Sequence, residues 1–157
     1  MIAGMKRALA ILLLSVLVAA CSRPSDDHVV TVEKDDPAMN AAFAKARSET
    51  DSFLSLMNSG TVSGCSVKVG ISDGHQTEYF WLGDLTYADG VFSGTIDNDP
   101  ELVKNVKLGQ KYDVKKEEIY DWLYLQDGKM HGNYTARVLL PKMPKEEADK
   151  IRAMMAD

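Results

Sequence analysis

The sequence predicts an α+β domain in which an N-terminal amphipathic helix packs on a small antiparallel, barrel-like sheet and a C-terminal helix follows. Three observations lead to this prediction. Apolar residues recur at steps of three and four between residues 36 and 57, alternate with polar residues in several segments between 65 and 125, and regain a helical spacing after residue 144. The short alternating segments are joined by Asp-Gly turns, which favour an antiparallel meander.

The first helix has a clear beginning and a clear end in the sequence. Asp36 as N-cap and Pro37 in the first turn are typical of a helix start. Gly60, which follows Asn58 and Ser59, is a stop signal. The apolar stripe between them consists of Met39, Phe43, Ala46, Thr50, Phe53, Leu54 and Met57. The pattern therefore predicts one helix with one buried face.

The remaining elements are predicted from the change of period. The expected strands span residues 65–71, 77–82, 85–87, 91–96, 107–114 and 119–125. Residues 133–140 leave two interpretations open, a helix capped by Asn133 or a final strand. Residues 144–156 begin with proline, carry two glutamates in the first turn and are predicted to form an amphipathic helix.

The N-terminal residues predict export. Lys6 and Arg7 precede an apolar run over 8–20 that ends in small residues, the pattern of a secretory signal peptide. A membrane-spanning helix needs about 20 apolar residues, more than this run provides. Cys21 directly follows Val-Ala-Ala, which resembles the bacterial lipoprotein box, and the resemblance implies cleavage before Cys21 and its acylation, for example with palmitate. The predicted organisation is therefore a signal peptide (1–20), a lipidated tether (21–35) and a single domain (36–157).

Net charge narrows the choice of partners. The chain carries a net charge of −5, and removal of Lys6 and Arg7 with the leader leaves −7. An acidic surface offers no electrostatic attraction for nucleic acid or for anionic headgroups. Membrane attachment is therefore expected through the acyl anchor on Cys21. Because Ser22 follows Cys21, the lipoprotein resemblance implies a periplasm-facing position in the cell envelope, at the outer membrane.

Motifs of common catalytic sites are absent from the sequence. It contains no Gly-x-Ser-x-Gly, no His-Glu-x-x-His and no Cys-x-x-Cys, and the spacing of His28, His75 and His131 is not that of metal ligands. We expect no cofactor and no metal, and the acidic residues between 97 and 101 are interpreted as a turn. Cys65 lies in an alternating segment and is expected to pack as a small apolar residue.

Aromatic residues concentrate in the predicted sheet and allow two interpretations. Most small domains use such residues to fill the core, because each buries about 150 to 250 Å². The alternative is a binding groove lined by one of the two tryptophans, with charged and amide side chains beside it. The residues of this possible groove are Trp81, Asp84, Asp97, Asn98, Trp122 and Arg137.

Four stretches within residues 36–139 resemble the YegJ-like family of uncharacterised bacterial proteins, the domain of unknown function 2314. They are residues 36–42, 78–84, 92–100, and 119–124 together with 132–135. The resemblance implies a domain made of one helix and a small sheet, and it brings no catalytic residue.

Three hypotheses about function follow. The leading one is a lipid-anchored binding or scaffolding module without catalysis, with an envelope protein as its partner. The alternative is a small envelope hydrolase that uses carboxylates of the sheet loops, such as Asp84, Asp97 or Asp121, with His131. The third is a protective protein that masks a partner.

Overall fold

The structure, a computed structural model, describes residues 36–157. The predicted signal peptide, the lipidation site Cys21 and the tether lie outside the described residues.

A six-stranded antiparallel sheet, in the order β4-β3-β2-β1-β5-β6, forms the framework of the domain. Its strands are β1 (Ser63–Ser72), β2 (Thr77–Ala88), β3 (Val91–Ile96), β4 (Lys111–Lys115), β5 (Asp121–Gln126) and β6 (Lys129–Gly132). The α+β prediction is confirmed, but the expected barrel-like closure is wrong. After β4 the chain crosses through the 3-10 turn η1 (Lys116–Glu118) and pairs β5 with β1, so β4 and β6 remain the two edges of an open sheet.

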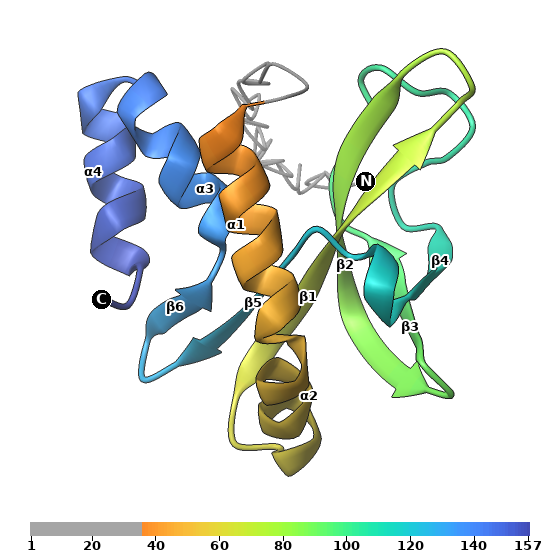
Figure 1. Cartoon of the computed structure of the whole chain (residues 1–157), viewed down its shortest axis with the longest axis horizontal. Coiled ribbons are helices and arrows are strands. Elements are labelled where there is room, and N and C mark those ends of the chain that lie inside the picture. Colours follow the sequence, from red (N-terminus) through yellow and green to blue (C-terminus); the bar gives the residue numbers. More distant parts are fainter. Residues whose placement is uncertain (1–35) are drawn as a thin grey trace, which may run out of the picture.

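Four helices accompany the sheet in the part of the chain that the structure describes. They are α1 (Pro37–Ser48), α2 (Thr50–Ser59), α3 (Tyr134–Leu139) and α4 (Lys145–Met154), with a second 3-10 turn, η2 (Leu140–Lys142), after α3. Figure 1 shows α1 and α2 following each other along the sheet, with α3 and α4 beside α1 and the β2, β3 and β4 strands on the other side. The predicted C-terminal helix and the helical alternative for residues 133–140 are confirmed.

The ends of the N-terminal helical segment are as predicted. The Asp36 carboxylate accepts hydrogen bonds from the backbone N–H groups of Ala38 (2.9 Å) and Met39 (3.1 Å), and Pro37 occupies the first turn. Gly60 ends α2 in the left-handed conformation, with φ of 68°. The cap satisfies donors that would otherwise lack a partner at the helix start.

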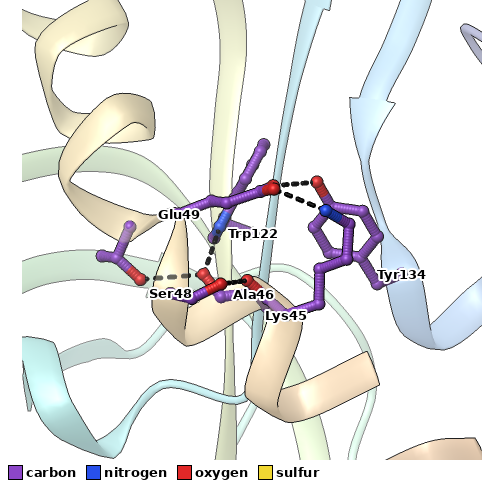
Figure 2. Close-up of polar contacts among 7 residues, drawn as sticks. Lys45, Ala46, Ser48, Glu49, Trp122 and Tyr134 are labelled. Carbon is purple, nitrogen blue, oxygen red and sulfur yellow. Dashed lines mark hydrogen bonds and ion pairs between the residues drawn. The ribbon is translucent and has the colours of Figure 1, made fainter. Parts of the chain in front are cut away.

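The predicted single helix is interrupted at Glu49, and a tertiary contact provides the reason. The Ala46 carbonyl accepts the indole N–H of Trp122 (2.8 Å), as Figure 2 shows, and it also accepts the hydroxyl of Thr50 (3.1 Å). The backbone N–H of Glu49 also donates to this oxygen, in the tighter spacing of a 3-10 turn. The helix therefore ends as α1, and α2 begins in a new direction.

Two strands differ from their predicted bounds. Residues 77–82 and 85–87 belong to one strand, β2, because a register shift between Gly83 and Thr86 absorbs the irregularity without ending the pairing with β3. The strand predicted over 107–114 begins only at Lys111, since a turn at Gly109 precedes it.

Phe53 on α2 is at the centre of the hydrophobic core. Its side chain is fully buried, and its ring stacks on Trp122 with centroids 5.2 Å apart. Val67 and Val69 on β1 contribute to the same core, while the alternating Lys68 points to the other face of the strand. Burial of each large apolar side chain stabilises the fold by about 1.5–3 kcal/mol.

Candidate functional site

Three of the possible groove residues meet at β2. The Trp81 side chain is partly exposed, and its backbone N–H donates to the Asn98 side-chain oxygen at 2.9 Å. The backbone N–H of Asp97 donates to the Trp81 carbonyl at 3.0 Å. These bonds fix the loop after β3 against β2, so Trp81, Asp97 and Asn98 lie together.

The structure places the other three predicted residues elsewhere. Asp84 is exposed, with a positive φ of 48° in the irregular part of β2. Trp122 is 5% exposed and belongs to the core. The Arg137 guanidinium donates to the Ala156 carbonyl at 2.8 Å and so holds the C-terminal residues. The six residues are therefore not gathered into one groove.

The loop that follows Asp97 is organised by a residue that sequence reasoning did not single out. The buried carboxylate of Glu78 accepts the backbone N–H groups of Glu101 (3.0 Å), Leu102 (2.9 Å) and Val103 (3.1 Å). Among residues 36–157, no group of three or more His, Cys, Asp or Glu side chains could hold a metal ion.

Asp121 is fully buried, and its carboxylate holds α3 in place. One oxygen accepts the backbone N–H groups of Trp122 (2.9 Å) and Tyr134 (3.2 Å). The other accepts the backbone N–H (2.8 Å) and the hydroxyl (2.7 Å) of Thr135. A charge can be buried in this way because each of its oxygens is hydrogen-bonded.

Lys68 completes a hydrogen-bonded series that we call the Lys68 relay, formed by Lys68, Thr135 and Asp121. The Lys68 ammonium donates to the Thr135 hydroxyl oxygen at 2.7 Å, and the nitrogen lies 4.6 Å from the centre of the Trp81 ring. The sheet register pairs Lys68 with both Trp81 on β2 and Asp121 on β5. Burial lowers the pKa of Lys68 to about 8, and the negative charge of Asp121 offsets part of this effect.

The sequence held a signal for this relay. Lys68 is the one charged residue in the alternating segment 65–71, and Asp121 lies between two aromatic residues, Tyr120 and Trp122. A charged residue inside a half-buried strand needs a partner. The sequence does not give the register of β1 with β5. That register places Lys68 beside Asp121, with Thr135 between them.

A second polar cluster joins α1 to α3 (Figure 2). The Glu49 carboxylate accepts hydrogen bonds from the Lys45 ammonium and from the Tyr134 hydroxyl. These two contacts, with Lys45 the larger cause, lower the pKa of Glu49. Burial, followed by the Glu49 carboxylate, raises the pKa of Tyr134. The cluster connects the C-terminal end of α1 to α3.

Cys65 and the two described histidines lie apart from the relay. Cys65 on β1 packs against the core, and burial raises the pKa of its thiol. His75 is exposed in the turn between β1 and β2. His131 is part of β6 and stacks its ring on Tyr124 with centroids 4.8 Å apart.

A hollow of about 410 Å³ lies beside the β4 edge. It is lined by β4, by the connection from β4 to β5, by Gly70 of β1 and by Arg47 of α1. Three carboxylates, those of Asp113, Glu117 and Glu118, surround it. The Arg47 side chain donates to the Ile119 carbonyl at 3.1 Å and lies over the Tyr120 ring. The hollow, with the edge next to it, forms an acidic surface with aromatic side chains.

The comparisons define the class of this protein. The chain belongs to the family described as "Uncharacterized protein conserved in bacteria (DUF2314)", whose model matches residues 36–155. It is 44% identical to "Uncharacterized protein YegJ" of Escherichia coli (strain K12) over 151 residues, which are 96% of this chain and 99% of that protein. It is also 27% identical over 134 residues to a putative ankyrin repeat protein of Neisseria meningitidis serogroup B, covering 78% of this chain and 52% of that protein. No solved structure matches the chain.

Proposed function

We propose that this protein is a lipid-anchored, periplasm-facing envelope protein whose domain binds an extended, basic segment of a partner protein at the β4 edge, without catalysis. The observation that carries the proposal is an unpaired strand edge beside an acidic hollow. Proteins recognise extended segments by adding them to such an edge, where backbone hydrogen bonds supply affinity and neighbouring side chains supply specificity.

Within residues 36–157, the backbone of β4 is bonded to β3 on one side and has no strand paired with it on the other. Lys116 donates its N–H to the Gly90 carbonyl, and the Gln110 carbonyl accepts the N–H of Ile96, both at 2.9 Å. Bonding alternates along an antiparallel strand, so the odd-numbered residues between these two direct their backbone groups away from β3. These residues are Lys111, Asp113 and Lys115.

The other edge of the sheet is covered by the chain itself. Met130 on β6 forms a parallel bridge with Met155, and its carbonyl accepts the N–H of Ala156 at 2.8 Å. An exposed edge is a liability that proteins usually cover, twist or protect with charge. Of the two edges of the sheet, β6 is covered and β4 is not, so β4 is the edge that can pair with a segment of a partner.

Charge supports a basic occupant. The three carboxylates of the hollow face one cation, Arg47, whose side chain already contacts Ile119 and Tyr120. Of the neighbouring lysines, Lys111 donates to the Thr95 hydroxyl (2.7 Å) and Lys116 to the Asp51 carboxylate (2.9 Å). The charge of Lys116 is balanced by a carboxylate, whereas Lys111 and Lys115 on β4 remain positively charged. In the lining of the hollow itself three carboxylates face one arginine, and this negative balance favours a positively charged segment.

The anchor is supported by the leader described above. Each buried methylene of an acyl chain contributes about 0.8 kcal/mol, and stable attachment takes more than one chain. No helix within residues 36–157 is long and apolar enough to cross a membrane. The proposal assigns attachment, at the outer membrane, to acyl chains on Cys21.

The hydrolase hypothesis receives less support from the described residues. All four hydrogen bonds of the buried Asp121 carboxylate serve to hold α3 and Trp122. Asp84 and Asp97 are exposed. General acid–base catalysis needs such groups within hydrogen-bond reach of one another or of a substrate, often with shifted pKa values.

A peptide titration tests the binding site. The probe is a peptide of alternating lysine and valine, and its control is a peptide of alternating glutamate and valine of equal length. We expect the basic peptide to shift the amide resonances of Lys111, Asp113 and Lys115. Asp113→Pro should abolish the effect because proline lacks the outward N–H, whereas Asp113→Ala, which loses the carboxylate but keeps the N–H, should only weaken it. Equal shifts with both peptides, or none at β4, would contradict the proposed site.

Membrane attachment is tested separately. We expect the wild type to partition into detergent and to incorporate labelled palmitate, and the Cys21→Ser variant to do neither. A Cys21→Ser variant that is still labelled and still partitions with the membrane would rule out the proposed anchor.

A further inference from the structure

The three carboxylates that line the hollow beside β4 are available to a cation of a partner. Asp113, Glu117 and Glu118 are exposed, and none of them forms an ion pair in the part of the chain that the structure describes. The neighbouring Lys116 is directed elsewhere, since its ammonium pairs with Asp51 on α2 at 2.9 Å. The hollow therefore offers carboxylate oxygens that no lysine or arginine of the described residues neutralises by contact.

Tyrosine rings form another part of the lining. Tyr112 on β4 and Tyr120 in the connection to β5 both border the hollow and are half-buried. Gly70 of β1 leaves the room that the Tyr120 ring occupies, because a Cβ at this position would lie 3.1 Å from a carbon of that ring. The hollow, of about 410 Å³, is thus lined by aromatic rings as well as by carboxylates.

Arg47 shows how this lining holds a guanidinium. Its exposed side chain lies over the Tyr120 ring, with the central guanidinium carbon 5.2 Å from the ring centre, and its Nε donates to the Ile119 carbonyl at 3.1 Å. A planar guanidinium stacks on aromatic rings and binds a carboxylate through two parallel hydrogen bonds, whereas the ammonium of lysine acts as a compact, strongly hydrated charge. Tyr112 and the three carboxylates can serve a second guanidinium in the same hollow.

We propose that the segment bound at the β4 edge places an arginine in this hollow, and that the site prefers arginine to lysine. The guanidinium stacks on Tyr112 and pairs with the carboxylates of Glu117 and Glu118. Once it is bound, the three carboxylates of the lining face two guanidinium groups, so no excess of positive charge opposes binding. The preference rests on the proposed function, because the arginine belongs to the segment that pairs with β4.

The alternation of side chains along β4 determines which positions of the segment reach the hollow. Tyr112 and Val114 share one face of the strand, and both border the hollow. In an antiparallel pair, side chains that stand directly opposite each other lie on the same face. For a segment added antiparallel to β4, the residues opposite Tyr112 and Val114 therefore have their side chains on the face that borders the hollow. We expect selection at alternate positions of the segment.

Two peptides of equal length and charge test the preference. One is the alternating lysine–valine peptide, and in the other arginine replaces lysine. Titrations of the full chain, followed by the amide resonances of β4, give both dissociation constants. We expect the arginine peptide to bind about fivefold more tightly or better, because stacking on a ring adds to the charge attraction that both peptides share. Nuclear Overhauser contacts between the arginine side chain and the Tyr112 ring should accompany this binding.

The outcomes separate the preference from the proposed function. Equal dissociation constants at β4 would overturn the preference for arginine and leave the binding of a basic segment standing. Binding of neither peptide at β4 would overturn both.

Tyrosine variants assign the preference to the hollow. Tyr112→Leu should bring the two peptides to about equal affinity, whereas Tyr112→Phe, which keeps a ring, should retain the preference. Tyr87→Leu is the matched control, because Tyr87 is half-buried against the same core but does not line the hollow, and it should leave the preference unchanged. If Tyr112→Leu does not fold, the wild-type ratio and the contacts to the Tyr112 ring still decide. A preference that persists in folded Tyr112→Leu would refute the assignment.

Discussion

Replacing Lys68 with methionine tests whether the fold holds this lysine at a lowered pKa. In the folded chain burial lowers the pKa of Lys68 from 10.5 to about 8, whereas the unfolded chain has an ordinary lysine. Below about pH 8 the lysine is charged in both the folded and the unfolded state, and its partial dehydration destabilises the folded state. Between the two values the unfolded state binds more protons than the folded state. The free energy of unfolding of the wild type therefore gains a favourable contribution as the pH rises through this window.

The size of this contribution follows from the two pKa values. The gap between 10.5 and about 8, at about 1.4 kcal/mol per pKa unit, corresponds to about 3 kcal/mol. Lys68→Met removes the titrating group and keeps a long apolar side chain. We expect the stability of the wild type, relative to Lys68→Met, to improve by about 3 kcal/mol between about pH 7 and about pH 11.

Urea denaturation at several pH values, followed by tryptophan fluorescence, measures this difference. All other titrating groups are common to both proteins and cancel in the comparison. Lys107→Met, at an exposed position, is the matched control and should give a difference from the wild type that does not vary with pH. Parallel pH profiles for the wild type and Lys68→Met would show that the lysine is not held away from water.

Three further substitutions test the contacts that build the domain. Asp121→Asn should cost about 2–4 kcal/mol, because its amide would face the N–H and hydroxyl of Thr135, which both need an acceptor; an unchanged urea midpoint would contradict this. Trp122→Phe should cost about 1–2 kcal/mol in thermal unfolding through loss of the hydrogen bond to Ala46, and wild-type stability would show that the bond contributes nothing. Phe53→Ala should cost about 3–5 kcal/mol by calorimetry, since it leaves a cavity in the centre of the core; a cost below about 1 kcal/mol would place Phe53 outside it.

Local signals predicted the positions and types of most elements. The Asp36 cap, the left-handed Gly60 and the alternation along β1 depend on residues close in sequence, and each occurs in the structure as expected. The interruption at Glu49 could not be predicted in this way. The indole that competes for the Ala46 carbonyl comes from Trp122, 76 residues further along the chain.

Some residues of the predicted groove also follow from local sequence, whereas others depend on distant parts of the chain. Trp81, Asp97 and Asn98 were singled out by residue type and do meet, because β2 and the loop after β3 are neighbours in both sequence and space. Trp122 and Arg137 were chosen by the same criterion, but the core and the C-terminal residues are their actual partners. Residue type indicates what a side chain can bind, and the fold decides what lies within reach.

The sequence by itself determined an α+β domain of this family, with helix ends fixed by caps and strands fixed by alternation, since these depend on steric and hydrogen-bonding preferences over a few residues. Only the tertiary structure decided that the sheet stays open at β4, that β6 is covered by residues 155–156, and that Lys68 meets Asp121 through Thr135. The physical reason is register: β1 pairs with β5 across more than 50 residues of intervening chain, and that pairing places a lysine and a carboxylate on either side of one hydroxyl.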